Sequence, residues 1–561
     1  MHARTFATLL FPFLVVPPPA PAAQPVKPAK PALTLVIVVD QMRADYLDRF
    51  DDLFGEGGFH LLTKHGARFT RVSYPYSATI TGPGHSVVLS GIPPSKNGII
   101  GNDWYDRRLN RAYYCCEDSE VRAVGTDPGN AAGKLSPRNF QGESIADMLR
   151  RASPGSKAIG IALKDRGAIL PAGKHPTGAY WFEYSSGRWI TSSYYDSSLP
   201  KWVGDFDDKG APGYLGREWT KLLPEAAYAR QGPDAGAGEG NLPGESSPVF
   251  PHRVFDLAAE PAGKGTPRLK RFESFVCTPY GDDFTIAFAE AAIRGERLGQ
   301  RGASDILSVS LSSPDYCGHV FGPDSHEIED ILLRLDRQLA GFFHFVDSAV
   351  GMRNVAIVLT ADHGVAPLPE QSASKGGLRL SASDFLMDVK VHMGQTYNYD
   401  EGQDNLVRSL INGSLWLDTS GVAGHKFDLA RFEKDIAAFA ERRPGVARCY
   451  LRDEILKFPP GEPGDSIIGK VRESYDPVRG ADLVIVPKPY CIFGDKDPAN
   501  HGSPYWYDCR VPLIFYGSMF KAGAYDAPSS PLDIAPTLAR ALSVPPPKGC
   551  EGRALTECFA Q

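Results

Sequence analysis

The chain of 561 residues lacks a strong excess of positive charge, and beyond its N-terminal region it has no long apolar run. Its net charge at pH 7 is −6, which excludes binding to nucleic acid or acidic membranes through bulk positive charge. Without a later stretch of about twenty apolar residues, we expect no membrane span in the mature chain. The sequence also contains no internal repeat. These absences favour a globular protein, and 42% apolar residues are enough for a large core.

The nine cysteines include no pair with zinc-finger spacing, so a thiolate metal site is not expected. Nine is a high number for a cytosolic enzyme and is compatible with an exported one. Cys550 and Cys558 are close enough in sequence to close a short loop, but the sequence does not define the pairing. An odd number leaves at least one thiol free or bonded to another molecule.

The first residues have the features of an export signal. Arg4 provides positive charge, residues 6–16 are mostly apolar, and Ala20-Pro21-Ala22 resembles a cleavage site. We therefore predict a signal peptide over residues 1–23, followed by a Pro/Ala-rich tether to Pro31. The alternative is an uncleaved anchor. The apolar run is too short to span a membrane and no cysteine follows it closely. These features predict a periplasmic or secreted protein with no stable membrane anchor.

Apolar strands alternate with amphipathic helices along the rest of the chain. Predicted strands cover residues 33–39, 158–163, 305–311, 355–360, 483–486 and 511–516. Predicted helices cover residues 144–151, 283–295, 328–350 and 531–542, with a helical pattern up to residue 62, a small helix at 86–89 and a loop at 93–102. This order predicts an α/β fold with a largely parallel central sheet and helices on both faces.

Two regions depart from this alternation. Residues from about 170 to 280 combine an aromatic, hairpin-like stretch at 180–195 with a Gly/Pro/Ser-rich segment at 232–248. Residues from about 368 to 480 mix helix and strand signals. We interpret both as cap segments inserted into one domain of residues 24–561, the first carrying exposed aromatic side chains. Packing of the insertion is the favoured role of residues 180–195, and contact with a substrate leaving group is the alternative.

Polar side chains follow four of the predicted strands. They are Asp40, Lys164 with Arg166, Asp315, and Asp362 with His363. Because the carboxyl ends of parallel strands line the ligand crevice of an open α/β sheet, we expect these side chains to meet. His319, four residues after Asp315, and His501, in a glycine-flanked loop, add two imidazoles.

Together these residues offer three carboxylates and three imidazoles: Asp40, Asp315, His319, Asp362, His363 and His501. Six such groups exceed the needs of one tetrahedral zinc and suit two ions with open positions. Two ions can hold the entering and leaving oxygens of a displacement at phosphorus. Taken singly, each histidine is more often structural, and Asp362-His363 alone is also compatible with a polar turn after a strand.

Thr81 is the candidate nucleophile, because it lies where a loop meets the start of a helix, close to free N–H groups that suit a phosphate. The alternative role for Thr81 is an ordinary N-cap. Thr79 is the alternative nucleophile.

Eight short motifs occur in a defined order along the chain. They are Thr81-Gly-Pro-Gly-His85, Gly98-Ile-Ile-Gly-Asn102, Lys164-Asp-Arg166, Asp315-x3-His319, Ala361-Asp-His-Gly364, Asn500-His-Gly502, Asp533-Ile-Ala-Pro-Thr-Leu538 and Gly552-Arg553. Together they resemble the alkaline phosphatase superfamily, and within it the exported bacterial alkaline phosphatases that use a threonine nucleophile. The chain differs from sulfatases, since Thr81 and His85 stand where sulfatases carry Cys/Ser and Arg.

The resemblance implies two zinc ions and no third, magnesium site. One zinc would be held by Asp40, Thr81, Asp362 and His363, and the other by Asp315, His319 and His501. Thr81 would form a covalent phosphothreonine. Asn102, Lys164 and Arg166 would bind the phosphoryl oxygens, with Lys164 supplying the charge of the missing third metal.

The cationic pair Lys164 and Arg166 favours the dianion of a phosphate monoester over the monoanion of a diester. We therefore predict an exported two-zinc alkaline phosphatase that acts on small phosphate monoesters and binds no nucleic acid. One alternative is a nucleotide pyrophosphatase or phosphodiesterase on the same scaffold. Another is an exported phosphate-ester-binding protein without turnover. The sequence does not determine the oligomeric state, and a monomer is favoured.

Overall fold

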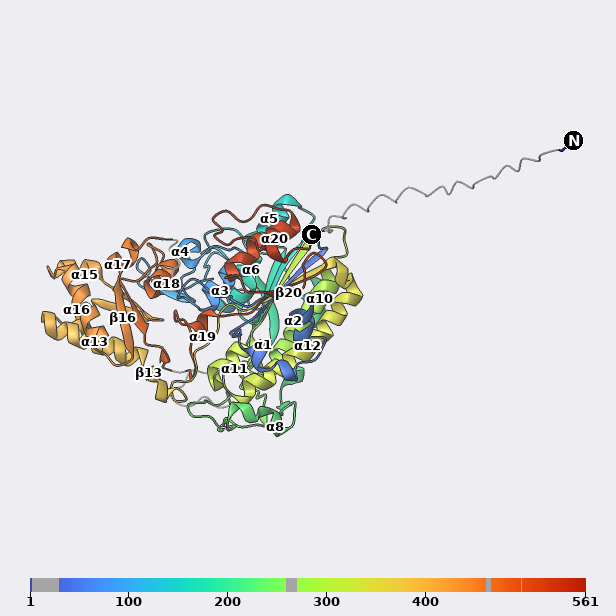
Figure 1. The fold of residues 1–561 in the computed structure, drawn as a ribbon. Coiled ribbons are helices and arrows are strands. Elements are labelled where there is room, and N and C mark those ends of the chain that lie inside the picture. The colour runs from blue at the N-terminus through green and yellow to red at the C-terminus, as the bar shows by residue number, and fades with distance from the viewer. Residues whose placement is uncertain (3–29, 259–269, 461–465, 496, 561) are drawn as a thin grey trace.

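The computed structural model describes residues 1–2, 30–258, 270–460, 466–495 and 497–560 (Figure 1). Residues 3–23 of the predicted signal peptide and most of the tether lie outside these residues. Among the described residues, no helix has the length and apolar character needed to cross a membrane. All nine cysteines are free thiols, so the short loop between Cys550 and Cys558 is not closed by a disulfide.

A ten-stranded sheet forms the centre of the molecule, in the order β20-β2-β19-β12-β1-β11-β6-β7-β8-β5. Its strands are β1 (Leu33–Val39), β2 (Ala67–Phe69), β5 (Ala123–Val124), β6 (Ala158–Ala162), β7 (Gly178–Glu183), β8 (Arg188–Ser192), β11 (Asp305–Leu311), β12 (Val355–Thr360), β19 (Leu513–Tyr516) and β20 (Gly523–Tyr525). The five central strands, β12-β1-β11-β6-β7, run parallel, and the neighbours β19 and β8 run antiparallel to them. The predicted parallel sheet is confirmed.

The central strands are buried along their whole length because both faces of the sheet are covered. Every residue of β1 is buried, as are those of β11 and β12. The helices α2 (Phe59–His65), α10 (Pro279–Glu296) and α12 (His326–Val350) lie on one side of the sheet. The helices α5 (Ile145–Ala152), α6 (Asp165–Ala172) and α20 (Ile534–Leu542) lie on the other (Figure 1). The predicted α/β class with helices on both faces is confirmed.

A second, smaller sheet projects from one side of this body, in orange in Figure 1. Its antiparallel strands, in the order β14-β15-β17-β16, are β14 (Val407–Ile411), β15 (Ser414–Leu417), β17 (Leu483–Pro487) and β16 (Val446–Leu451). Helices α13 (Ala382–Tyr397), α15 (Thr419–Gly424), α16 (Leu429–Glu441), α17 (Arg452–Lys457) and α18 (Ile467–Ser474) accompany it. The predicted strand at 483–486 therefore belongs to this sheet and not to the central one.

The aromatic stretch at 180–195 differs from its prediction. Residues 178–192 form β7 and β8 of the central sheet, and Trp181, Phe182 and Trp189 are almost fully buried. Trp189 stacks on Phe288 of α10, with ring centroids 4.1 Å apart. The expectation of exposed aromatic side chains was therefore wrong for β7 and β8, although Tyr194 after β8 is exposed, and the favoured packing role describes the residues of the two strands. The boundaries of the two inserted segments stay a prediction.

Three local expectations also need correction. The small helix predicted at 86–89 is α3 (Thr81–Val88), which begins five residues earlier. The loop predicted at 93–102 contains α4 (Pro94–Asn97), and the helical pattern up to residue 62 is broken into α1 (Tyr46–Arg49), a short 3-10 helix (Asp51–Leu53) and α2. Glycine and proline in these segments weaken the helical signal of the sequence, while tertiary packing still forms the helices.

Candidate active site

Four adjacent central strands, β12-β1-β11-β6, deliver the predicted side chains to one edge of the sheet. Asp40 directly follows β1, and Asp362 and His363 follow β12 by two and three residues. Asp315 lies in the first turn of α11 (Ser313–Phe321), the helix after β11, and Lys164 is the N-cap residue of α6, after β6. The structure thus brings together the polar groups that the sequence placed at strand ends.

Two groups of acids and imidazoles have ligand atoms close enough to share a metal ion. The first contains Asp40, Asp362 and His363, and the second contains Asp315, His363 and His501. His363 Nε2 lies 3.5 Å from Asp40 Oδ1, 3.3 Å from Asp362 Oδ2 and 3.9 Å from Asp315 Oδ1. His363 therefore stands between the two groups.

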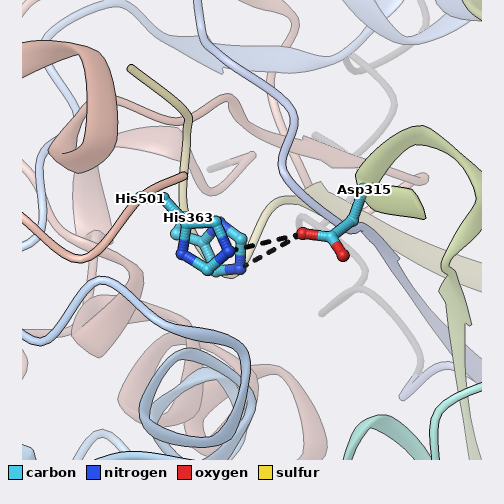
Figure 2. A group of neighbouring side chains, drawn as sticks. All are labelled: Asp315, His363 and His501. Carbon is cyan, nitrogen blue, oxygen red and sulfur yellow. Dashed lines mark ion pairs between the residues drawn. The ribbon is translucent and has the colours of Figure 1, made fainter. Parts of the chain in front are cut away.

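The imidazoles of His363 and His501 are stacked, with ring centroids 3.7 Å apart, and both face Asp315 (Figure 2). His501 Nε2 lies 3.5 Å from Asp315 Oδ1, as does His319 Nε2. His319 comes one helical turn after Asp315 on α11, so the two side chains share a face of that helix. The three predicted ligands of the second ion, Asp315, His319 and His501, thus lie side by side.

All three histidines have the same protonation pattern. Each Nδ1 atom lies 2.9 Å from a backbone carbonyl oxygen. The carbonyl belongs to Ala499 for His319, to Gly364 for His363 and to Thr79 for His501. A carbonyl oxygen only accepts, so Nδ1 carries the proton in each ring. The lone pair of Nε2 then points toward the carboxylates, as in imidazoles that bind a metal.

The acid groups fit a cation, because part of their charge is buried without a partner. Asp40 is fully buried, and its Oδ1 atom accepts no hydrogen bond from the described residues. Leaving buried carboxylate oxygens unsatisfied costs free energy that a bound cation would recover. The mixture of carboxylate and imidazole donors is suited to zinc.

Lys164 connects the two groups. Its ammonium lies 2.7 Å from Asp40 Oδ2 and forms an ion pair with Asp315 as well. Burial works against the charged form of Lys164, but Asp315 and Asp40 outweigh it and raise its pKa. Burial and the neighbouring Asp315 and Asp362 raise the pKa of Asp40. Burial also lowers the pKa of His363, to about 3, so this imidazole is neutral and its lone pair is free.

Thr81 is the first residue of α3, and its hydroxyl faces the metal-ligand candidates. The Oγ1 atom lies 3.4 Å from His363 Nε2, and the side chain is almost fully buried. The N-cap residue of α3 is Ile80, and no side chain caps this helix end. The alternative of an ordinary N-cap threonine is therefore not what the structure contains.

Thr79, the alternative nucleophile, is held away from these groups. Its hydroxyl donates to the carbonyl of Ser503 at 3.0 Å, while its own carbonyl accepts from His501. Thr79 thus orients the loop that carries His501.

Asn102 and Arg166 flank the N-terminus of α3. The side-chain oxygen of Asn102 accepts the backbone N–H of Gly82 at 2.8 Å, which leaves its NH₂ group without a partner among the described residues. Arg166 Nη1 donates to the hydroxyl of Tyr114 at 3.3 Å. Both side chains keep N–H groups available for an anion next to Thr81.

Two residues that contact the ligand candidates were given no role at the metal site from the sequence. Gln41 donates its backbone N–H to Asp362 Oδ1 at 3.2 Å and its side-chain amide to Asp315 Oδ1 at 2.9 Å. His85 Nδ1 lies 3.1 Å from Asp362 Oδ2. Gln41 contacts both acids because its backbone has a positive φ of 68°, a conformation that the local sequence does not predict. Its position directly after Asp40 was the available clue.

Comparison with known proteins identifies extended similarity. A family model described as Type I phosphodiesterase / nucleotide pyrophosphatase matches residues 34–499. Alkaline phosphatase PafA of Elizabethkingia meningoseptica is 37% identical over 536 residues, which cover 95% of each chain. Alkaline phosphatase PhoV of Synechococcus elongatus is 34% identical over 539 residues, covering 96% of this chain and 94% of PhoV. The crystal structure of wild-type PafA matches with a TM-score of 0.87 at 36% identity, covering 95% and 99% of the two chains.

Proposed function

Since the chain belongs to the type I phosphodiesterase / nucleotide pyrophosphatase family, we propose that this phosphoric monoester hydrolase is a two-zinc alkaline phosphatase with Thr81 as its nucleophile. Its fold is the alkaline phosphatase-like α/β fold. The observation that carries the proposal is the position of the Thr81 hydroxyl, 3.4 Å from His363 Nε2, beside both groups of acids and imidazoles.

Each zinc ion has its own set of side chains in this proposal. Asp40, Thr81, Asp362 and His363 hold one ion, and Asp315, His319 and His501 hold the other. Bound there, the ions supply Lewis acidity and positive charge to the entering and leaving oxygens of a displacement at phosphorus. The buried ammonium of Lys164, paired with Asp40 and Asp315, supplies positive charge beside them, so we propose no third metal.

The chain's own groups bind and orient the phosphoryl group. Asn102 Nδ2, Lys164 and Arg166 hold its non-bridging oxygens, and the N-terminus of α3 adds the positive end of a helix. Thr81 Oγ1 forms a bond to phosphorus as the bond to the leaving oxygen breaks, which gives a phosphothreonine. Water then cleaves the phosphothreonine and releases phosphate.

The setting of the reaction is part of the proposal. The predicted signal peptide supports a periplasmic or secreted location. The proposed substrates are small phosphate monoesters, and a monomer is the favoured state. Nucleic acid is not among its partners, because the net charge of −6 gives no general attraction to a polyanion.

The test compares Thr81→Ala with the matched control Thr79→Val. Thr81→Ala is expected to lower kcat for an aryl phosphate by at least about a thousandfold, since it removes the attacking oxygen. Mass spectrometry of acid-quenched wild type should find one phosphate on Thr81, and none in the variant. Thr79→Val should retain most activity because the carbonyl that orients His501 is unchanged. Full turnover by Thr81→Ala would remove the mechanism.

The second candidate function is that of a nucleotide pyrophosphatase or phosphodiesterase, because the matching family model carries that description. The rates on an aryl phosphate and on its alkyl diester distinguish the two functions. Lys164 and Arg166 together offer two positive charges, which match the dianion of a monoester better than the monoanion of a diester. We expect the monoester to react faster, and a faster diester reaction would favour the second function.

A further inference from the structure

The β3–β4 hairpin lies next to the phosphoryl-binding groups proposed above. Strand β3 (Asp103–Asp106) pairs antiparallel with β4 (Arg111–Tyr114), and Tyr114 stands opposite Asp103. Asn102 comes just before β3, and its carbonyl accepts the backbone N–H of Cys115 at 2.8 Å. The open end of the hairpin therefore fixes Asn102 and Tyr114 relative to each other.

The hydroxyl of Tyr114 stands between two oppositely charged neighbours. It accepts a hydrogen bond from Arg166 Nη1 at 3.3 Å and donates one to the carboxylate of Asp165. Among the described residues, no side chain other than Tyr114 accepts a hydrogen bond from the guanidinium of Arg166. The Nε atom of Arg166 is buried and has no acceptor among these residues. The orientation of the guanidinium thus depends on this contact.

Arg166 and Asp165 are neighbours in the sequence and carry opposite charges. In the described part of the chain they nevertheless form no ion pair within 4.0 Å. The Tyr114 hydroxyl engages the carboxylate of Asp165 and presents an oxygen to Arg166 in its place. A direct bidentate pair with Asp165 would occupy the N–H groups that a phosphoryl group needs. The phenol therefore keeps the guanidinium available.

We propose that Tyr114 is a positioning residue, whose hydroxyl separates Arg166 from Asp165 and aims the guanidinium at the phosphoryl group. The proposal rests on the proposed function, in which Arg166 binds the substrate. Through the β3–β4 hairpin, the same residue ties Arg166 to Asn102, so two phosphoryl-binding side chains move as one unit.

The first test is Tyr114→Phe, with Tyr113→Phe as its matched control. The Tyr113 hydroxyl donates to the carbonyl of Glu117 at 3.0 Å and touches none of the site residues described above. For Tyr114→Phe we expect kcat/KM on an aryl phosphate to fall about tenfold to a hundredfold, as for a lost hydrogen bond to a charged group. Binding of inorganic phosphate to the zinc-loaded protein should weaken to a similar extent. Tyr113→Phe should remain within about twofold of wild type in both measurements.

A double-mutant cycle separates positioning from a general structural effect. If Tyr114 acts through Arg166, Tyr114→Phe in an Arg166→Ala background changes kcat/KM by less than about twofold. Adding Asp165→Asn to Tyr114→Phe should restore part of the lost phosphate binding, because it removes the competing carboxylate. An equal loss from Tyr114→Phe in both backgrounds, or no rescue by Asp165→Asn, would overturn the proposal.

Failure of the proposed function and failure of the proposed role of Tyr114 give different results. A wild-type protein that binds inorganic phosphate in a Tyr114-dependent way, but hydrolyses no monoester, would contradict the proposed function and retain the role of Tyr114. A wild-type enzyme with monoesterase activity and phosphate binding unaffected by Tyr114→Phe would overturn the role of Tyr114 alone.

Discussion

At the scale of single residues, the site depends on how buried charges are distributed. Burial opposes the ionised form of Asp315, but Lys164, His319 and His501 outweigh it and lower the pKa of this carboxyl. Burial opposes ionisation of Asp362 in the same way, and His363 and His85 lower its pKa. Both acids therefore stay ionised at neutral pH. A metal ion entering the site therefore meets these two carboxylates already ionised.

Lys164→Ala is expected to reduce monoesterase activity far more than diesterase activity, by at least about tenfold in the ratio of the two kcat/KM values. The reason is that the ammonium adds a second positive charge, and a monoester presents a second negative charge. Rates on an aryl phosphate and its alkyl diester measure this ratio. Lys157→Ala is the control. Lys157 lies just before β6, at the end of the strand away from the site, and forms an ion pair with Glu296. Equal losses on both substrates would show that Lys164 does not set the preference.

Residues that lie within a few positions of the end of a buried strand were predictable from the sequence. Asp40, Asp315 and Asp362 meet in the structure because the carboxyl ends of parallel strands share one edge of the sheet. Gln41 and Tyr114 were not predictable as partners of the site, since their contacts depend on a left-handed backbone at one position and on a hairpin register at the other. Their roles arise from tertiary structure and not from local pattern.

At the scale of elements, the position of Thr81 depends on how closely α3 packs against the segment after β12. Glycine in α3 permits this close packing. A Cβ on Gly84 would lie 2.3 Å from the carbonyl oxygen of Asp362 and 2.7 Å from its Cβ. Neither of these atoms is the far end of a flexible side chain, so α3 or the end of β12 would have to shift. The position of the Thr81 hydroxyl beside His363 therefore depends on glycine at position 84.

Gly84→Ala is expected to lower kcat/KM on an aryl phosphate by at least about tenfold and to reduce the zinc content, because it separates Thr81 from the Asp362–His363 segment. Gly341→Ala is the matched control. Gly341 lies on the exposed side of α12 with no atom within 4 Å of an added Cβ, so alanine there should leave activity unchanged and raise stability by up to about 1 kcal/mol. Unimpaired activity of Gly84→Ala would show that the close packing of α3 against Asp362 is not required.

A second element-scale prediction concerns Asp282, whose buried carboxylate accepts the N–H of Ser313 at the start of α11. Burial raises the pKa of Asp282 from 3.8 to about 7. Between these values the folded state binds a proton that the unfolded state has lost, so the contribution of Asp282 to stability falls as pH rises through this window. The shift corresponds to at most roughly 4 kcal/mol.

Asp282→Asn keeps a side-chain oxygen for Ser313 and removes the ionisation. The free energy of unfolding of the variant relative to wild type should therefore rise between pH 4 and pH 7 and stay constant above that. Urea unfolding at pH 5 and pH 8 measures the difference. A variant that is destabilised equally at both pH values would show that ionisation of Asp282 does not limit stability.

The elements differ in how well the sequence predicted them. The strands β1, β11 and β12 were predictable because their six or seven residues are mostly apolar or β-branched, a composition typical of a buried strand. The start of α3 was not, because Gly82, Pro83 and Gly84 weaken the helical signal. The strand β17 was predicted but not its sheet, since pairing with β15 and β16 is a tertiary property.

At the scale of the whole molecule, the fold gathers negative charge that it does not neutralise by itself. Asp40, Asp315 and Asp362 arrive from three different strands, while Lys164 is the buried cation that pairs directly with two of them. Such an arrangement costs stability unless cations bind. Zinc ions would offset this cost and raise the stability of the folded chain in proportion to their affinity.

The central claim is that two metal ions lie beside the hydroxyl of Thr81. It is tested most directly by diffraction from crystals of the zinc-loaded protein at the zinc absorption edge. We predict two separate anomalous peaks, one among Asp40, Thr81, Asp362 and His363 and the other among Asp315, His319 and His501. A single peak, or no peak next to Thr81 in a crystal of active protein, would contradict the two-zinc mechanism.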